Sequence, residues 1–244
     1  MPASISKQDF GGRRRAALAG AWRALGIPAV VVGASYIGFG ALVHQAGLSV
    51  WHGLFSTVTG WAQPGQVALV ELYAVGASVL VIAAAVALTS IRLLPLAVTL
   101  MPLIRGPGVP RWQYYLVAHV ISVTTWIGAV RDCPRLPAAQ RLPYFTGFAC
   151  TAWLITIAAT VIGFGLAGAL PLPATLGLVF INPLYFMLVV AGDVRSRTRV
   201  LAAVFGALCG PPLFLLSPDW SLLIAGLGAG SLGFILGGAG RRPA

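Results

Sequence analysis

The chain has 244 residues, of which 58% are hydrophobic and only 9% charged, and its mean hydropathy is +0.90. A soluble domain carries about 25% charged residues, and one this apolar would expose large aggregating patches. The formal net charge of +11 is dispersed between apolar segments, which argues against nucleic-acid binding and indicates basic flanks that contact membrane lipids. We therefore expect an all-α, polytopic helical membrane protein.

The apolar stretches predict roughly seven to nine helices, because a full crossing takes about 20 residues. The expected ranges are 21–43, 50–62, 66–88, 90–104, 112–130, 145–168, 173–191, 198–216 and 220–239. The apolar run 67–104 is too long for one crossing and is divided near Thr89. Its second piece is short and is expected to be a half-length or re-entrant segment.

Arginine-rich segments are expected to face the cytoplasm. That rule places the following segments inside: 1–19, 131–143, 193–199 and 241–244. We expect a single transmembrane domain over 20–240, between a basic tail at 1–19 and a short one at 241–244.

Helix 112–130 complicates this topology because arginines flank both of its ends. Either 90–104 and 112–130 form a pair whose Gly/Pro turn lies outside, or one of the two does not span. The pair is the preferred interpretation.

Two parts of the chain resemble each other. Residues 21–66 and 145–183 both read as a long helix, a short link, a short apolar piece and a break. Short, interrupted segments in corresponding halves point to a transporter's substrate site. The arginine pattern starts both parts from the inside, so whether the repeats are inverted stays open.

The breaks carry the most informative polar residues. Gln63, Gly65 and Gln66 surround Pro64, and Asn182 precedes Pro183 in the second break. Unwound backbone at membrane depth is tolerated only where it is buried in protein or lines a cavity. Free N–H groups at the following helix start favour an anionic ligand group, and the amide side chains add donors and acceptors. The alternative is an ordinary external turn.

Other polar residues interrupt the apolar helices, where each needs a partner or a function. Glu71 is a proton-coupling carboxylate or a counter-charge for an ammonium group, or alternatively an interfacial residue that reaches water. Arg92, after the Thr89-Ser90 interruption, binds a carboxylate or backbone carbonyls, or extends to the headgroups. His119 is a proton relay or a structural hydrogen-bonding group.

No catalytic signature, nucleotide motif or metal-ligand spacing is present, and the three cysteines are scattered. We therefore expect no catalytic residues, no metal and no cofactor, and uphill transport would have to use an ion gradient. A secondary transporter is the main hypothesis. The alternatives are a lipid-modifying membrane enzyme, for which the chain has few acids and histidines, and a non-transporting structural or assembly subunit.

The breaks also resemble a known family. Ala62-Gln63-Pro64-Gly65-Gln66 and the later Gly76-Ala77-Ser78 resemble the AGSAQF…AAGAS stretch of the AzlC family of branched-chain amino-acid permeases. The spacing continues through Ser90, Arg92 and Leu100-Met101-Pro102, and Trp153 and residues 176–183 resemble later family segments. Ser90 replaces an Asn of that pattern, Val179 replaces an Asp, and an acidic element near 117–124 is missing.

The resemblance implies export of branched-chain or similar apolar amino acids across a bacterial cytoplasmic membrane, together with a small AzlD-type membrane subunit. The N-terminus would be cytoplasmic. A zwitterionic apolar substrate needs two polar clamps and an apolar pocket. The candidate substrate-binding residues are Gln63, Gly65, Gln66, Ser90, Arg92 and Asn182, and the candidate coupling residues are Glu71 and His119.

Overall fold

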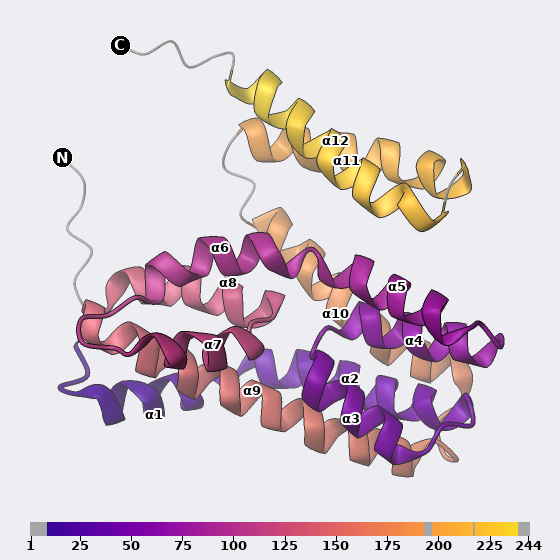
Figure 1. Ribbon diagram of the computed structural model, residues 1–244, viewed down its shortest axis with the longest axis horizontal. Helices are drawn as coiled ribbons and strands as arrows, with labels where there is room; N and C mark the ends of the chain where they lie inside the picture. Colours follow the sequence, from indigo (N-terminus) through magenta and orange to yellow (C-terminus); the bar gives the residue numbers. More distant parts are fainter. Residues whose placement is uncertain (1–8, 193–196, 217, 239–244) are drawn as a thin grey trace. The chain divides into compact units, whose positions relative to one another are not determined.

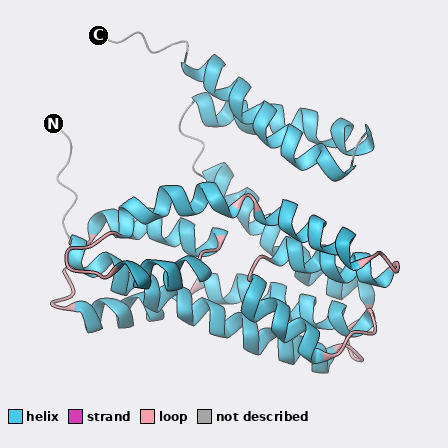
Figure 2. Ribbon diagram, viewed as in Figure 1, coloured by secondary structure: helices cyan, strands magenta, loops and turns pink. Residues whose placement is uncertain are grey.

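The computed structural model describes residues 9–192, 197–216 and 218–238, and within these ranges it contains helices and no strand (Figure 2). The predicted all-α membrane fold is confirmed. The chain forms two compact units, Met1–Asn182 and Pro183–Ala244. Each unit is described by itself below.

The first unit is built around α9 (Ala138–Leu166), which packs along α1 (Arg13–Ala24) and α2 (Ile27–Gln45) (Figure 1). With 29 residues, α9 is about 44 Å long at 1.5 Å per residue, whereas the hydrocarbon core is about 30 Å thick. Helical structure begins at Arg13, inside the segment expected to be a tail. It is interrupted before Pro28, which occupies the first turn of α2.

Glycines bring these helices into backbone contact. Gly20 of α1 lies against the carbonyl of Tyr144, and Gly147 of α9 lies against that of Ala17. A Cβ atom at either glycine would overlap the opposite backbone.

The contact between α2 and α9 repeats this arrangement, with Gly40 against Thr160 and Gly163 against Ile37. Small residues at crossing points are how helices pack closely in lipid, where no hydrophobic effect drives them together.

Gly163→Ala is therefore expected to destabilise the protein, because its methyl group would collide with the Ile37 carbonyl. Overpacking typically costs about 1–3 kcal/mol. Gly165→Ala is the matched control, since a Cβ there meets nothing within 4 Å and alanine favours the helix. Thermal unfolding in detergent should show a lower midpoint for Gly163→Ala only; equal midpoints would contradict the close packing.

Two short helical hairpins occupy the middle of the chain. The first consists of α3 (Val50–Gly60) and α4 (Gln63–Ala74), and the second of α7 (Arg111–His119) and α8 (Val123–Asp132). Each arm is roughly 14–18 Å long at 1.5 Å per residue, about half of a crossing.

The hairpins enter the first unit from opposite ends, and their tips meet (Figure 1). The residues at the tips, Trp61, Ala62, Val120 and Ile121, are buried. His119 Nε2 donates a hydrogen bond to the Val58 carbonyl at 2.6 Å, which joins the two tips directly.

Between the hairpins, α5 (Val79–Ser90) and α6 (Leu93–Ile104) form one long apolar passage that is interrupted at Ile91 and Arg92. The predicted helix 66–88 is wrong, because α4 ends at Ala74. Gly76 then adopts φ +76°, and the Ser78 side chain caps α5. A tight turn therefore lies within a continuous apolar run, where the hydropathy does not indicate it.

The predicted helix 112–130 is also wrong, because this segment forms two short helices, α7 and α8, and not one helix that pairs with 90–104. Arg141 Nη1 donates to the Leu103 carbonyl at 3.3 Å, so the Gly/Pro turn after α6 lies beside the start of α9. Segment 111–132 therefore turns back at Val120–Ser122 and returns to the end of the first unit at which it began, beside the start of α9.

We call this end of the first unit the arginine end. Arg23 pairs with Asp132 at 3.5 Å, and Tyr144 donates to the same carboxylate at 2.8 Å. Arginines gather here on several segments: Arg13, Arg14, Arg15 and Arg23 in α1, and Arg105, Arg111, Arg131, Arg135 and Arg141. We call the opposite end, where Gln45 donates to the Leu170 carbonyl at 3.3 Å, the neutral end.

The repeated pattern in the structure is a long helical passage followed by a hairpin. Helices α1 and α2 precede the hairpin at the neutral end, and α5 and α6 precede the hairpin at the arginine end. These two parts run in opposite directions. They differ from the expected similarity of 21–66 and 145–183.

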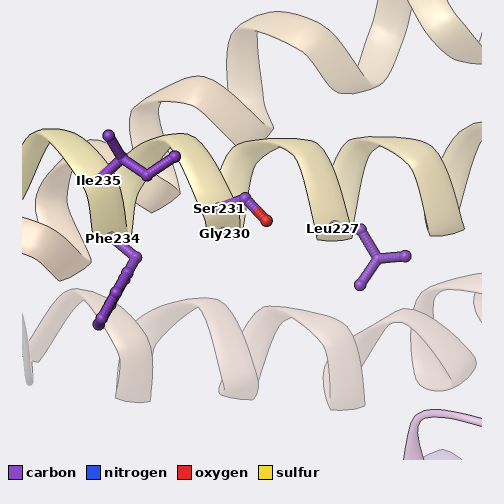
Figure 3. Close-up of a pocket in the computed structure, with 6 residues that line it drawn as sticks. Leu227, Gly230, Ser231, Phe234 and Ile235 are labelled. Carbon is purple, nitrogen blue, oxygen red and sulfur yellow. The ribbon is translucent and has the colours of Figure 1, made fainter.

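The start of α10 (Leu172–Gly192) belongs to the first unit, which ends at Asn182. In the second unit, α11 (Arg197–Leu216) packs on α12 (Pro218–Gly238), with Gly233 against the Ala202 backbone. Figure 3 shows a hollow along α12 lined by Leu227, Ser231 and Phe234, among others. Its lining contains one hydroxyl and no charged group, so we assign it no ligand.

Cys133 lies at the arginine end in a short 3-10 helix, Cys133–Arg135, and is fully buried. Burial raises the pKa of its thiol to about 12. Because only the thiolate reacts, a variant that retains Cys133 as its sole cysteine should resist maleimide at pH ~8 until it is denatured. Arg135 is exposed, so Arg135→Cys in a background without other cysteines should react at once and serves as the control. Rapid labelling of Cys133 in the native protein would contradict its burial.

Candidate functional site

Two amide side chains of the predicted breaks, Gln63 and Asn182, meet inside the first unit. The break predicted at 182–183 is itself wrong, because α10 is continuous through Pro183. Gln63 Nε2 donates to the Ser35 carbonyl at 3.3 Å, and Asn182 Nδ2 donates to Gln63 Oε1 at 2.6 Å. The Ser35 carbonyl accepts only, so it orients both amides. Asn182 Oδ1 is consequently left buried without a hydrogen-bond partner among the described residues.

Gln66 forms a second buried junction one turn along α4. Tyr36 donates to Gln66 Oε1 at 2.7 Å, while Gln66 Nε2 donates to Ser56 Oγ at 3.1 Å and Thr57 Oγ1 at 3.0 Å. Both hydroxyls donate in turn to the Gly53 carbonyl. The amide therefore ties α2, α3 and α4 together, and its polar atoms are all hydrogen-bonded.

The local sequence explains this placement. Residues three apart share a helix face, so Gln63 and Gln66 both point from α4 toward α2. Pro64 lies in the first helical turn, where its missing N–H costs nothing. The amides of Gly65 and Gln66 bond back to the Ala62 carbonyl at 2.9 and 3.1 Å, so these two N–H groups are already used.

Arg92 supplies a positive charge near the junction. It lies in the interruption between α5 and α6, and its Nε atom is buried without a hydrogen-bond partner among the described residues. Ser90 is turned away, because its hydroxyl donates to the Val86 carbonyl of its own helix at 2.7 Å. Gly65 packs against Thr89 and Val86, where a side chain would be tight.

The two candidate coupling residues lie apart. Glu71 is exposed in the last turn of α4, toward the neutral end. His119, besides its bond to Val58, packs edge-on against Trp153 with ring centroids 6.0 Å apart. Trp153 Nε1 donates to the Thr57 carbonyl at 3.3 Å. Only His119 therefore touches the region where the hairpins meet.

Sequence reasoning missed several residues of this site. Ser35 and Tyr36 of α2 and Ser56 and Thr57 of α3 hold the glutamines but were not singled out. Ser35 and Tyr36 are adjacent polar residues midway along an otherwise apolar helix, and that signal was available.

A pocket of about 350 Å³ adjoins Gln66 between α3, α4 and α5. Its lining is mainly apolar. The lining residues are Trp51, His52, Phe55, Ser56, Thr59, Gly60, Ala62, Gly65, Gln66, Leu69 and Val86.

The described residues contain no group of three or more His, Cys, Asp or Glu side chains that could hold a metal ion. The chemistry of the site is therefore that of uncharged hydrogen-bonding groups beside one guanidinium. Such groups can hydrogen-bond to a polar molecule and orient it.

Comparison with known proteins assigns the family. The family model described as AzlC protein matches residues 28–170, more than half of the chain, whereas no curated protein and no solved structure matches. The matched range includes both hairpins and ends before Asn182. The chain belongs to the AzlC family, which is generally associated with branched-chain amino-acid transport and works with a small membrane subunit.

Proposed function

We propose that the protein is a secondary transporter that exports branched-chain or similar apolar amino acids. It works with a small AzlD-like membrane subunit in a bacterial cytoplasmic membrane, driven by an ion gradient. The observation that carries the proposal is the buried hydrogen-bonded site where the start of α4, after the interruption at Trp61 and Ala62, meets Asn182 of α10 and Tyr36 of α2. The arginine end would face the cytoplasm, and the N-terminus with it.

The unpaired atoms of the site match a zwitterion. A buried polar group without a partner costs about 1–3 kcal/mol, so its persistence favours a ligand that supplies the missing bond. Asn182 Oδ1 is an acceptor suited to an ammonium group, and Arg92 Nε is a donor suited to a carboxylate. Gln63 and Gln66 hold the surrounding helices in place.

The opposed hairpins suit alternating access. Half-length helices entering from opposite ends leave the site beneath both tips, so movement of one hairpin would open it to one end of the protein only. The bond between His119 and Val58 joins the tips and would break whenever either moves.

The test is amino-acid flux in proteoliposomes that contain the protein and its small subunit. Gln66→Ala and Arg92→Ala should abolish export while the variants still reach the membrane, because each removes a group at the site. Wild-type rates in both variants would overturn the assignment. Absence of flux for every amino acid in the wild-type protein would favour an assembly subunit instead.

Coupling is expected to depend on Glu71 and His119. Glu71→Gln should suppress transport driven by an ion gradient but leave exchange of labelled for unlabelled leucine unchanged, because exchange needs no net ion movement. Equal loss of both activities would assign Glu71 to substrate binding, and equal retention would remove it from the mechanism.

A further inference from the structure

The pocket beside Gln66 has one polar edge and several apolar walls. Gln66 and Ser56, which are hydrogen-bonded to each other, form the polar edge. Phe55, Leu69 and Val86 contribute apolar surface from three different helices. A ligand that fills this space would have an apolar body and a polar group at the end that lies against Gln66.

Two glycines of the pocket differ in the space around them. A Cβ atom on Gly65 would lie 3.0 Å from Thr89 Oγ1, so this glycine is required for the packing of α4 on α5. A Cβ atom on Gly60 would meet nothing within 4 Å, although Gly60 lines the pocket. Gly60 is also absent from the glycines with positive φ, so its backbone accepts any residue. Its missing side chain therefore leaves pocket space open.

We propose that this pocket receives the apolar side chain of the transported amino acid, and that Gly60 and Val86 set the length of side chain it admits. The proposal rests on the proposed transport function and adds which amino-acid side chains the transporter selects. The occupant is an amino-acid side chain because the pocket adjoins Gln66, whose amide is hydrogen-bonded to Tyr36 of α2 at the proposed substrate site. A lipid acyl chain is the competing occupant, but it has no polar group that could interact with the polar edge of the pocket.

The expected substrate range follows from the volume. The volume of about 350 Å³ accommodates any apolar side chain, and leucine, methionine and phenylalanine should be preferred to alanine and valine because they fill more of it. A side chain that leaves apolar space unfilled makes fewer van der Waals contacts with the pocket. Each methylene that it lacks should lower its transport relative to the larger substrate by about 10-fold or more.

The experiment measures competition by alanine, valine, leucine, methionine and phenylalanine against labelled leucine in proteoliposomes. Gly60→Val should reduce the preference for phenylalanine over alanine about 10-fold or more while alanine transport persists. Val86→Ala, which enlarges the pocket, should increase the preference for phenylalanine over alanine. Gly165→Val, which adds the same side chain at an open position outside the pocket, should leave all ratios unchanged.

Wild-type flux with unchanged ratios in both pocket variants would overturn the pocket assignment alone and indicate a groove filled by lipid. A uniform loss for all amino acids in Gly60→Val, with unchanged ratios in Val86→Ala, would also overturn it. Absence of amino-acid flux in the wild-type protein would overturn the proposed function as well.

Discussion

Gln66→Leu is expected to abolish amino-acid transport and to lower the thermal midpoint by roughly 4–15 °C, which corresponds to about 2–4 kcal/mol in a protein of this size. Leucine fills a similar volume but leaves the Tyr36 hydroxyl without its acceptor, and Ser56 and Thr57 without their donor. Each of these groups lies within the packed first unit, where lost hydrogen bonds are not replaced by water.

A double-mutant cycle isolates the Gln66–Tyr36 contribution. Tyr36→Phe removes only the hydroxyl, so adding it to Gln66→Leu should lower the free energy of unfolding almost no further. The coupling free energy between the two substitutions should be about 1 kcal/mol or more. Melting midpoints of the single and double variants provide the measurement. Strictly additive effects would show that the 2.7 Å contact contributes no stability.

Asn182→Leu is expected to raise the KM for leucine about 10- to 100-fold. A hydrogen bond to a charged group is worth about 1.5–3 kcal/mol, and each 1.4 kcal/mol is a factor of 10 in affinity. Asn182→Asp retains an acceptor oxygen in the same place and should lose much less. The decisive comparison uses 4-methylpentanoate, which has the leucine side chain and carboxylate but no ammonium group.

The loss of affinity in Asn182→Leu should be smaller for this analogue than for leucine, because the analogue has no ammonium group for Asn182 Oδ1 to accept from, whereas the lost bond to Gln63 affects both ligands alike. Inhibition of leucine flux by the analogue is the readout. An equal loss of affinity for leucine and for the analogue would assign Asn182 a packing role.

The first break could be predicted because proline, glycine and amide residues interrupt an apolar run locally. The interruption before Gln63 was predicted correctly, whereas the predicted break at 182–183 is wrong because α10 continues from Leu172 to Gly192 through Pro183. The sequence also could not show that Gln63 and Asn182 are hydrogen-bonded to each other. That contact joins positions far apart in the chain, and neither residue alone indicates its partner. The roles proposed for both residues stay predictions.

The hairpins could not be predicted for a different reason. Hydropathy measures whether a segment is apolar, and it does not show where a segment turns back. The turn at Val120–Ser122 contains neither glycine nor proline, and only the capping of α8 by Ser122, with Thr125 bonding back, marks it. This S-x-x-T pattern resembles a capping box but is too common to divide a helix by itself.

The central claim is that opposed hairpins close over one amino-acid site. Its most direct test is the accessibility of two single cysteines, Ser56→Cys in α3 and Ser122→Cys at the tip of the second hairpin, with Cys133, Cys150 and Cys209 replaced. A membrane-impermeant thiol reagent should reach Ser56→Cys only from the neutral end and Ser122→Cys only from the arginine end, and leucine should slow both reactions. Reaction of both cysteines from the same side, or rates unaffected by leucine, would contradict the account.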